Sequence, residues 1–236
     1  MPYILGYKTK TKTTSRKMFL DLLEVAKEKK VDLIVLTGDI VNNPSQSSTK
    51  FIFESLESTR IPYIYIAGNH DWHYEGMQGS AESLRQNWID KSLLKLYGGK
   101  NALYSSHVIS GINFVAIDNS IYQVNNEQLQ FYKTQLERKL PIVLLLHVPL
   151  YLGQKVKGKN ILVCGNPNWG WDKDRNYKIE RRDRWSESGN QASTSEFLET
   201  VKKSTNLVTV LAGHTHKTSA DSVTEHIQQY VTGCSC

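Results

Sequence analysis

Three different polar side chains follow one of the apolar segments of the sequence. Residues 63–67 read YIYIA, a composition typical of a β-strand, and Gly68 is followed by Asn69, His70 and Asp71. A strand that only had to turn would need glycine or asparagine and little else. An amide, an imidazole and a carboxylate together at one strand end therefore predict a chemical site.

Three other apolar segments end in a comparable way. Each leads into a side chain that can bind a metal ion: 32–37 into Asp39, 141–146 into His147, and 206–212 into His214 and His216. In an open α/β sheet the ligand crevice lies at the carboxyl ends of the strands, so these side chains are expected at one edge. A cluster of Asp, Asn and His suits a divalent transition metal such as manganese, iron or zinc.

Each of these strand ends also has an ordinary explanation. An aspartate after Thr-Gly, such as Asp39, is usually a turn residue. A histidine that ends a strand, such as His147, is usually a hydrogen-bonded polar residue, and the Gly-His-Thr-His that contains His214 could be a turn. All of these explanations would have to hold at once, and buried polar clusters need a partner. The sequence therefore favours a metal site.

Helices and buried strands alternate along the chain. Helices are predicted at 15–30, 48–58, 80–97, 125–139 and 193–203, and strands at 32–37, 62–67, 141–147, 206–213 and 228–233, with a hairpin formed by 103–109 and 112–117. Unbroken apolar strands are typical of sheets buried on both faces, so this order predicts an α/β fold with a parallel or mixed sheet. The apolar face of the first helix is predicted to hold Met18, Leu22, Val25 and Ala26.

The segment 153–192 departs from this alternation. It is rich in Gly, Asn, Trp, Arg and Asp and poor in aliphatic residues. A segment of this length without elements of its own is usually a functional loop inside a compact domain. We therefore expect a single domain, residues 1–236, with this excursion either covering the site as a lid or packing against the domain.

Composition excludes several classes of protein. The 236 residues are 39% hydrophobic and 22% charged, and no apolar run approaches the roughly 20 residues of a membrane helix, so no membrane span is expected. The net charge of +6 suits either a solvated face or a polyanionic partner. Nucleic acid is disfavoured because no nucleic-acid-binding motif accompanies the charge. Three cysteines make no disulfide framework, which favours a reduced, cytoplasmic chain.

The motifs Gly-Asp, Gly-Asn-His-Asp, a strand-terminal histidine and Gly-His-Thr-His occur in this order. They resemble the calcineurin-like metallophosphoesterase superfamily over roughly residues 15–233. The resemblance implies a four-layer α/β/β/α sandwich of two mixed sheets. It also implies hydrolysis of phosphomonoesters or phosphodiesters in a phosphorylated small molecule or macromolecule. Two divalent ions, manganese, iron or zinc, would clamp the phosphoryl group.

The resemblance also implies a role for each residue. Asp39 would bridge the two ions. Asn69, His147 and His214 would complete the shell of one ion, and His216 would bind the other. His70 would protonate the leaving group as the catalytic acid, and Asp71 would orient His70.

One motif of the superfamily is missing from the sequence. An Asp-x-His should precede the first helix, but residues 1–12 contain neither Asp nor His. Two explanations stay open: a chain that lacks its first and last strands, or a natural variant with one ion, or none, and reduced activity. The second explanation keeps an alternative function alive, a weakly active or inactive scaffold that binds a partner or a phosphorylated ligand. Asp118 and Asn119, at another strand end, either face the cleft or cap a turn.

Overall fold

The computed structural model describes residues 13–42, 44–72, 78–150, 152, 155–156, 159–160, 191–216 and 218–233. Within these ranges the helical elements are α1 (Ser15–Glu28), α2 (Gln46–Thr59), η1 (Asn69–Asp71), α3 (Ala81–Trp88), η2 (Ile89–Leu93), η3 (Leu94–Tyr97), α4 (Asn126–Glu137) and α6 (Ala192–Lys203). The strands are β1 (Ile34–Leu36), β2 (Tyr63–Tyr65), β3 (Tyr104–Ile109), β4 (Ile112–Ile117), β5 (Ile142–Leu145), β6 (Lys155–Val156), β7 (Lys159–Asn160), β8 (Leu207–Ala212), β9 (Ser219–Ser222) and β10 (Gln228–Val231).

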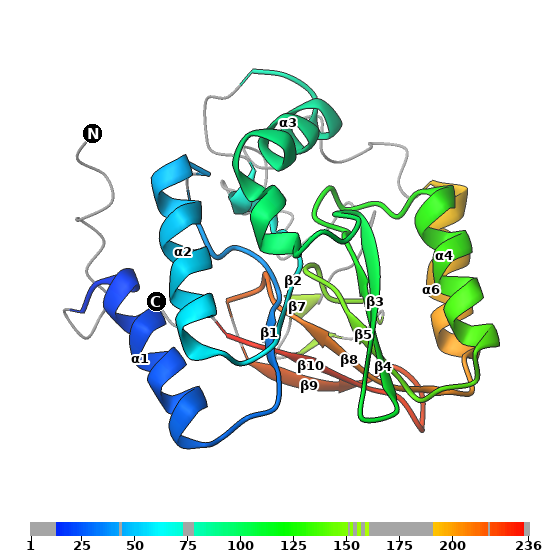
Figure 1. The fold of residues 1–236 in the computed structure, drawn as a ribbon. Coiled ribbons are helices and arrows are strands. Elements are labelled where there is room, and N and C mark those ends of the chain that lie inside the picture. Colours follow the sequence, from blue (N-terminus) through cyan, green and yellow to red (C-terminus); the bar gives the residue numbers. More distant parts are fainter. Residues whose placement is uncertain are drawn as a thin grey trace.

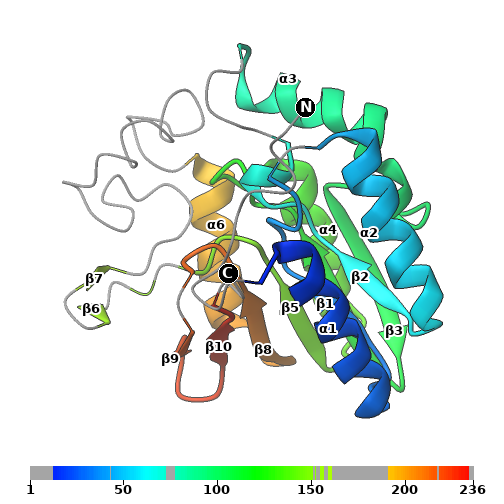
Figure 2. The same cartoon turned by 90° about the vertical axis from the view of Figure 1, so that its left-hand side faces the viewer.

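The largest sheet is mixed and has six strands in the order β3-β4-β5-β8-β10-β9. Strands β4, β5, β8 and β10 pair in parallel, whereas β3 and β9 pair antiparallel at the two edges. Strands β1 and β2 form a separate parallel pair, and β6 and β7 a short antiparallel one. The predicted α/β fold with a mixed sheet is therefore confirmed. Figure 1 shows α4 and α6 lying together on one side of the large sheet and α1 and α2 on the opposite side of the molecule, next to β1. Figure 2, turned by 90°, shows α1 and α2 from the front, lying over the β1–β2 pair.

Three apolar clusters hold these elements together. One joins α4 and α6 to the large sheet, where the rings of Tyr132 and Phe197 meet at 5.1 Å. A second joins the β1–β2 pair to the large sheet and includes Ile64 and Leu145. A third packs α1, α2 and α3 against the β1–β2 pair. The carboxyl ends of β1, β2, β5 and β8 are thereby held in one body, while the four-layer arrangement and the missing strands stay predictions.

The helix predicted at 80–97 is three elements of different pitch. An α-helix, a π-turn and a 3₁₀ turn follow one another without a break. The α-helix buries Ala81, Leu84 and Arg85, and the π-turn, which begins at Ile89, buries Ile89 and Leu93. The strand β9 and the turn η1 were not expected from the sequence.

Most of the predicted excursion 153–192 lies outside the described residues, except for β6, β7 and the first residue of α6. No helix within the described ranges is both long enough and apolar enough to cross a membrane.

The predicted apolar face of α1 is wrong for two of its four residues. Leu22 and Val25 are 52% and 48% exposed, whereas the neighbouring Leu23 is only 5% exposed. The helix contacts α2 along a narrow line, marked by Phe19 and Phe51 with ring centroids 6.3 Å apart. Only the side chains that follow this line are buried, so the broader apolar stripe of the sequence extends beyond the contact.

The two adjacent leucines of α1 provide a matched test of this contact. Leu23→Ala should lower the free energy of unfolding by about 2 kcal/mol or more, because it removes a buried side chain. Leu22→Ala should change it by less than about 0.5 kcal/mol. Urea unfolding of both variants measures the difference. Equal losses of stability in the two variants, or a larger loss for Leu22→Ala, would favour the apolar face predicted from the sequence.

Candidate metal centre

The predicted ligands follow the carboxyl ends of four strands. Asp39 comes after β1, Asn69 after β2, His147 after β5 and His214 after β8. Strand β1 pairs with β2, and β5 pairs with β8, so each pair of strands delivers two side chains to the same place. Among the described residues, Asp39, His147 and His214 form a group whose ligand atoms all lie within 4.8 Å of one another.

His147 lies at the middle of this group and is fully buried. Its Nδ1 is 2.7 Å from the carbonyl oxygen of Thr37, which can only accept, so Nδ1 carries a proton and donates it. In the neutral ring, Nε2 therefore carries the lone pair. This atom lies 3.0 Å from Nδ1 of His214, 3.1 Å from Oδ1 of Asn69 and 3.4 Å from Oδ2 of Asp39.

The spacing of these atoms fits a single divalent ion. Ligand atoms about 2.1 Å from one ion stand about 3.0 Å apart in octahedral and about 3.4 Å apart in tetrahedral coordination. Oδ2 of Asp39 is buried and makes no hydrogen bond among the described residues. A buried carboxylate oxygen of this kind needs a cationic partner. Two imidazole nitrogens, an amide oxygen and a carboxylate are ligands of the type that manganese, iron and zinc accept.

The pKa values reflect the same crowding. Burial raises the pKa of Asp39, but the charge and hydrogen bond of His147, together with the charges of His70 and His214, outweigh burial and hold this pKa well below its usual range. Burial lowers the pKa of His147, yet the charge and hydrogen bond of Asp39, together with the Thr37 carbonyl and the charge of Asp71, outweigh burial and raise this pKa overall. Burial and the charge of His147 lower the pKa of His214 well below its usual range. His147 is therefore the site of the proton that a metal ion would have to displace.

Two glycines allow the ligands to approach one another. A Cβ on Gly38 would lie 2.5 Å from Nδ1 of His147 and 2.7 Å from Cα of Gly68. A Cβ on Gly68 would lie 2.6 Å from Cε1 of His147 and would also collide with Asp39. Gly38 in addition has a φ of 92°, in the region that side-chain-bearing residues avoid. These contacts explain why a glycine precedes both polar groups in the sequence.

Asp71 binds the backbone of the two ligand loops. Its Oδ2 accepts hydrogen bonds from the N–H groups of Asp39, at 2.9 Å, and Gly68, at 2.8 Å, and its Oδ1 accepts from the N–H of Val41 at 2.8 Å. Burial and the charge of Asp39 raise the pKa of Asp71 to about 6, against the effect of these N–H groups. Asp71 thus holds the loops after β1 and β2 together, and its predicted action on His70 stays a prediction.

The other two predicted residues lie beside the group. The N–H of His70 donates to Oδ1 of Asp39 at 2.9 Å, and the charge of its ring is among the causes that lower the pKa of Asp39. His216 is exposed, has a φ of 54° and lies outside the three-residue group, although its charge contributes to the lowered pKa of His214. The predicted roles of His70 as an acid and of His216 as a ligand of a second ion stay predictions.

Sequence reasoning missed two contacts of the ligands. The Thr37 carbonyl that orients His147 carries no signal in the sequence, because any residue type has a carbonyl. The hydroxyl of Tyr122 lies 3.4 Å from Nε2 of His214, on the side away from His147. Tyr122 lies in the segment after Asp118, which the sequence marked only as a strand end.

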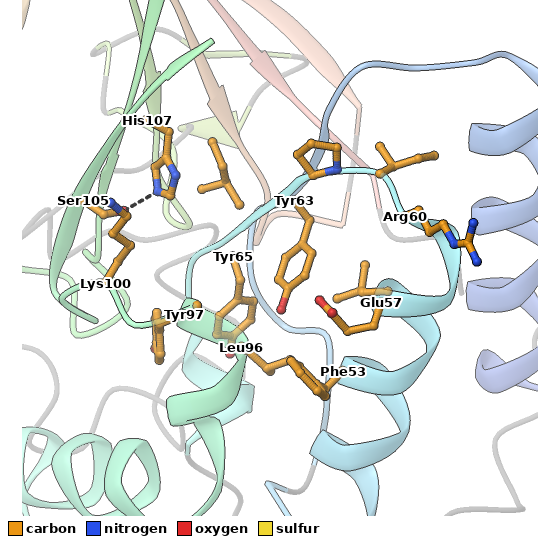
Figure 3. A pocket seen from close by; sticks show the side chains of 15 residues that line it. Phe53, Glu57, Arg60, Tyr63, Tyr65, Leu96, Tyr97, Lys100, Ser105 and His107 are labelled. Atoms are coloured by element: carbon orange, nitrogen blue, oxygen red, sulfur yellow. Dashed lines mark hydrogen bonds between the residues drawn. The ribbon is translucent and has the colours of Figure 1, made fainter.

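The structure also has a pocket of about 480 Å³ between β2, η3 and β3. Figure 3 shows Tyr63, Tyr65 and Tyr97 among its lining side chains, with Arg60 at its rim. In the same pocket His107 is hydrogen-bonded to Ser105. None of the predicted ligands lines this pocket. It is therefore separate from the candidate metal centre.

The sequence pattern of one protein family, described as calcineurin-like phosphoesterase, matches residues 14–218. The chain belongs to this family. Membership confirms the resemblance noted in the sequence. The metal-site group of Asp39, His147 and His214 lies inside the matched range.

Several curated relatives of this phosphoesterase are named probable cyclic nucleotide phosphodiesterases. One from Fibrobacter succinogenes is 28% identical over 142 residues, 59% of this chain and 51% of the relative. One from a Psychrobacter species is 22% identical over 217 residues, 88% of this chain and 53% of the relative. One from Moraxella catarrhalis is 41% identical over 61 residues, 26% of this chain and 22% of the relative. The chain spans about half the length, or less, of these relatives.

Solved structures agree in fold. A dimetal phosphatase from Danio rerio superposes with a TM-score of 0.55 at 13% identity, covering 92% of this chain and 77% of that protein. A putative 5′-nucleotidase from Staphylococcus aureus superposes with a TM-score of 0.51 at 12% identity, covering 99% of this chain and 46% of that protein. At such identities the likeness concerns the fold alone, and it confirms the α/β fold.

The close approach at Gly38 can be tested against a glycine of similar backbone conformation. Gly38→Ala should destabilise the protein by about 1–3 kcal/mol more than Gly111→Ala, because the added methyl group collides with Gly68 and His147. Gly111 has a φ of 80° and no neighbour within 4 Å of an added Cβ, so both variants share the backbone strain. Urea unfolding measures the difference. Equal destabilisation would mean that the ligand loops are not packed as described.

Proposed function

We propose that this chain is a metal-dependent phosphodiesterase that hydrolyses cyclic nucleotides. The observation that carries the proposal is the convergence of three ligand atoms, from Asp39, Asn69 and His214, at 3.0–3.4 Å from Nε2 of His147. The names of the relatives support the substrate class, because three of them are probable cyclic nucleotide phosphodiesterases. The predicted four-layer sandwich and cytoplasmic location are retained as part of this proposal.

The four convergent residues would hold one divalent ion, for which manganese, iron and zinc are the candidates. Such an ion supplies a Lewis acid for the phosphoryl group and activates water near neutral pH. Asp39 and His216 would contribute to a second ion, as predicted. The proposed ligands of the first ion are all present in this chain. The remaining ligands of the second ion would come from an Asp-x-His motif, which is absent from the sequence as given.

The side chains around the ligands supply the remaining chemistry. His70 follows Asn69 directly, and its backbone N–H donates to Oδ1 of Asp39, so its backbone is anchored beside the proposed metal ligands. We assign to His70 the transfer of a proton to the ribose oxygen that leaves phosphorus when the cyclic ester opens. Asp71 maintains the geometry by binding the amides of Asp39 and Gly68.

The function is tested by metal titration and hydrolysis together. The wild-type chain loaded with manganese, iron or zinc should bind at least one ion and hydrolyse 2′,3′- or 3′,5′-cyclic AMP to a nucleoside monophosphate. Asp39→Asn should weaken metal binding by more than about 100-fold, a loss greater than removal of an outer partner causes, and should abolish hydrolysis. Isothermal titration calorimetry and chromatography of the products measure the two effects.

The control and the contrary results are distinct. His226→Ala removes an exposed histidine that pairs with Glu225, and it should change neither metal affinity nor hydrolysis. A wild-type chain that binds an ion but hydrolyses no cyclic nucleotide would overturn the proposed activity and favour the scaffold alternative. A wild-type chain that binds none of the three metals would overturn the metal centre itself.

A further inference from the structure

A single short segment contacts three of the loops that carry the predicted ligands. This segment, Asp118–Tyr122, lies between β4 and α4 and is buried along its whole length. The sequence left open whether Asp118 and Asn119 face the cleft or cap a turn. The structure shows that the segment forms a turn, closed by a hydrogen bond of 2.8 Å from the N–H of Tyr122 to the carbonyl of Asn119. Its side chains reach the ligand loops from this turn.

Asn119 fixes the backbone at His147. Its Oδ1 accepts hydrogen bonds from the N–H of His147, at 3.1 Å, and from the N–H of Val148, at 2.9 Å. Its Nδ2 donates to the carbonyl of Val148 at 2.7 Å. Asn119 is fully buried, so no water can replace these bonds without a rearrangement. The side-chain amide of Asn119 therefore fixes the backbone position of His147, while the carbonyl of Thr37 fixes the orientation of its ring.

Tyr122 lies against the second imidazole ligand. Its ring meets the ring of His214 edge to face at 5.5 Å, and its hydroxyl lies 3.4 Å from Nε2. The hydroxyl can accept a hydrogen bond from Nε2–H, and in that tautomer the lone pair of His214 lies on Nδ1, the atom that faces His147. Partners of this kind fix the tautomer and ring orientation of metal-binding histidines.

The start of the same segment reaches the loop after β2. Ser120 accepts a hydrogen bond of 2.9 Å from the indole N–H of Trp72, which directly follows Asp71. Ser120 is held in turn by Asp118, which accepts from its N–H at 2.8 Å and from its hydroxyl at 2.6 Å. Arg85 places its guanidinium 3.5 Å from the other oxygen of Asp118. The turn is therefore held by a buried ion pair in addition to its contacts with the ligand loops.

We propose that Asn119 and Tyr122 are positioning residues that set the metal affinity of the centre by aligning His147 and His214. This inference rests on the proposed function, because it concerns the ligands assigned there. Neither residue is itself assigned as a ligand or as a group that touches the substrate. Both act through the imidazole they hold, so their loss should weaken binding of the ion more than it weakens the fold.

Asn119 has a matched control in Gln229. Gln229 is also fully buried and also pairs its amide with the backbone of the segment after β5, where Leu150 donates to Oε1 at 2.6 Å and accepts from Nε2 at 3.2 Å. It contacts Leu150, three residues beyond His147. Asn119→Ala should weaken binding of Mn²⁺ by about 10–100-fold. Gln229→Ala should leave the affinity within about threefold of wild type, although it removes a comparable pair of hydrogen bonds.

Tyr122→Phe keeps the shape of the side chain and serves as the variant least able to disturb folding. It should weaken binding of Mn²⁺ by about tenfold. Its control is Tyr132→Phe, which removes a buried hydroxyl bonded to Ser204 at 3.2 Å, in the cluster under α4 and α6. Tyr132→Phe should leave the affinity unchanged. The Co²⁺-loaded Tyr122→Phe variant should also show a shifted visible spectrum, because the orientation of one imidazole ligand has changed.

Calorimetric titration of the full chain with Mn²⁺ gives the affinities, and urea unfolding of the metal-free variants gives the stabilities. The inference is supported if the two site variants lose affinity and their controls do not at comparable stability. It is overturned if site and control variants lose affinity equally, or if Tyr122→Phe and Asn119→Ala both bind as wild type does. Should Asn119→Ala not fold, the Tyr122 pair decides. Absence of hydrolysis by a metal-binding wild type would refute the proposed activity and leave this comparison intact.

Discussion

The metal centre depends on how closely two glycines approach each other beneath one imidazole ring. Gly38 and Gly68 leave no room for a Cβ, and the ring of His147 lies directly against both. This contact brings the loops after β1 and β2 near enough for Asp39 and Asn69 to face the same nitrogen. A side chain at either glycine would push the two loops apart. The ligand atoms could then no longer keep their spacing of 3.0–3.4 Å.

Two carboxylates, Asp39 and Asp71, have different partners at this contact. Asp39 directs Oδ2 toward the imidazoles, and Asp71 directs both of its oxygens toward backbone N–H groups. Their electrostatics differ accordingly, because the imidazoles lower the pKa of Asp39 while burial and the charge of Asp39 raise that of Asp71 to about 6. Like charges this close are stable only with compensating positive charge. A divalent ion beside Asp39 would supply this positive charge. The stability of the two loops would then depend on the presence of the ion.

A hierarchy of supports surrounds the ligands. The carbonyl of Thr37 and the amide of Asn119 hold His147, and the ring of Tyr122 holds His214. Behind them, the ion pair of Arg85 with Asp118 fixes the turn that carries Asn119 and Tyr122. Rigid supports of this kind matter for catalysis because a small displacement of a ligand changes the geometry of the reacting groups. The supports come from β4 and α3 as well as from the strands that carry the ligands, so they depend on the whole fold.

The sequence by itself determined the chemistry of this protein and the order of its elements. Apolar strands that end in Asp39, Asn69, His147 and His214 were sufficient to predict an α/β fold and a metal site, because strand ends in such folds meet at one edge. The family was predicted from the resemblance of the motifs, and the family match confirms it. Local pattern was less informative where several elements meet. The stripe that includes Leu22 continues past the contact with α2, and periodicity alone did not reveal the π-turn that begins at Ile89.

Only the tertiary structure decided what holds the ligands in place. The bonds of Asn119 to His147 span 28 residues, and those of Asp71 to Asp39 span 32. A carbonyl such as that of Thr37 leaves no trace in residue types, and a tyrosine such as Tyr122 could serve any buried position. Contacts of this kind arise when distant segments are packed together. The ligands could therefore be found from their chemistry and spacing, whereas their supports became visible only once the chain was folded.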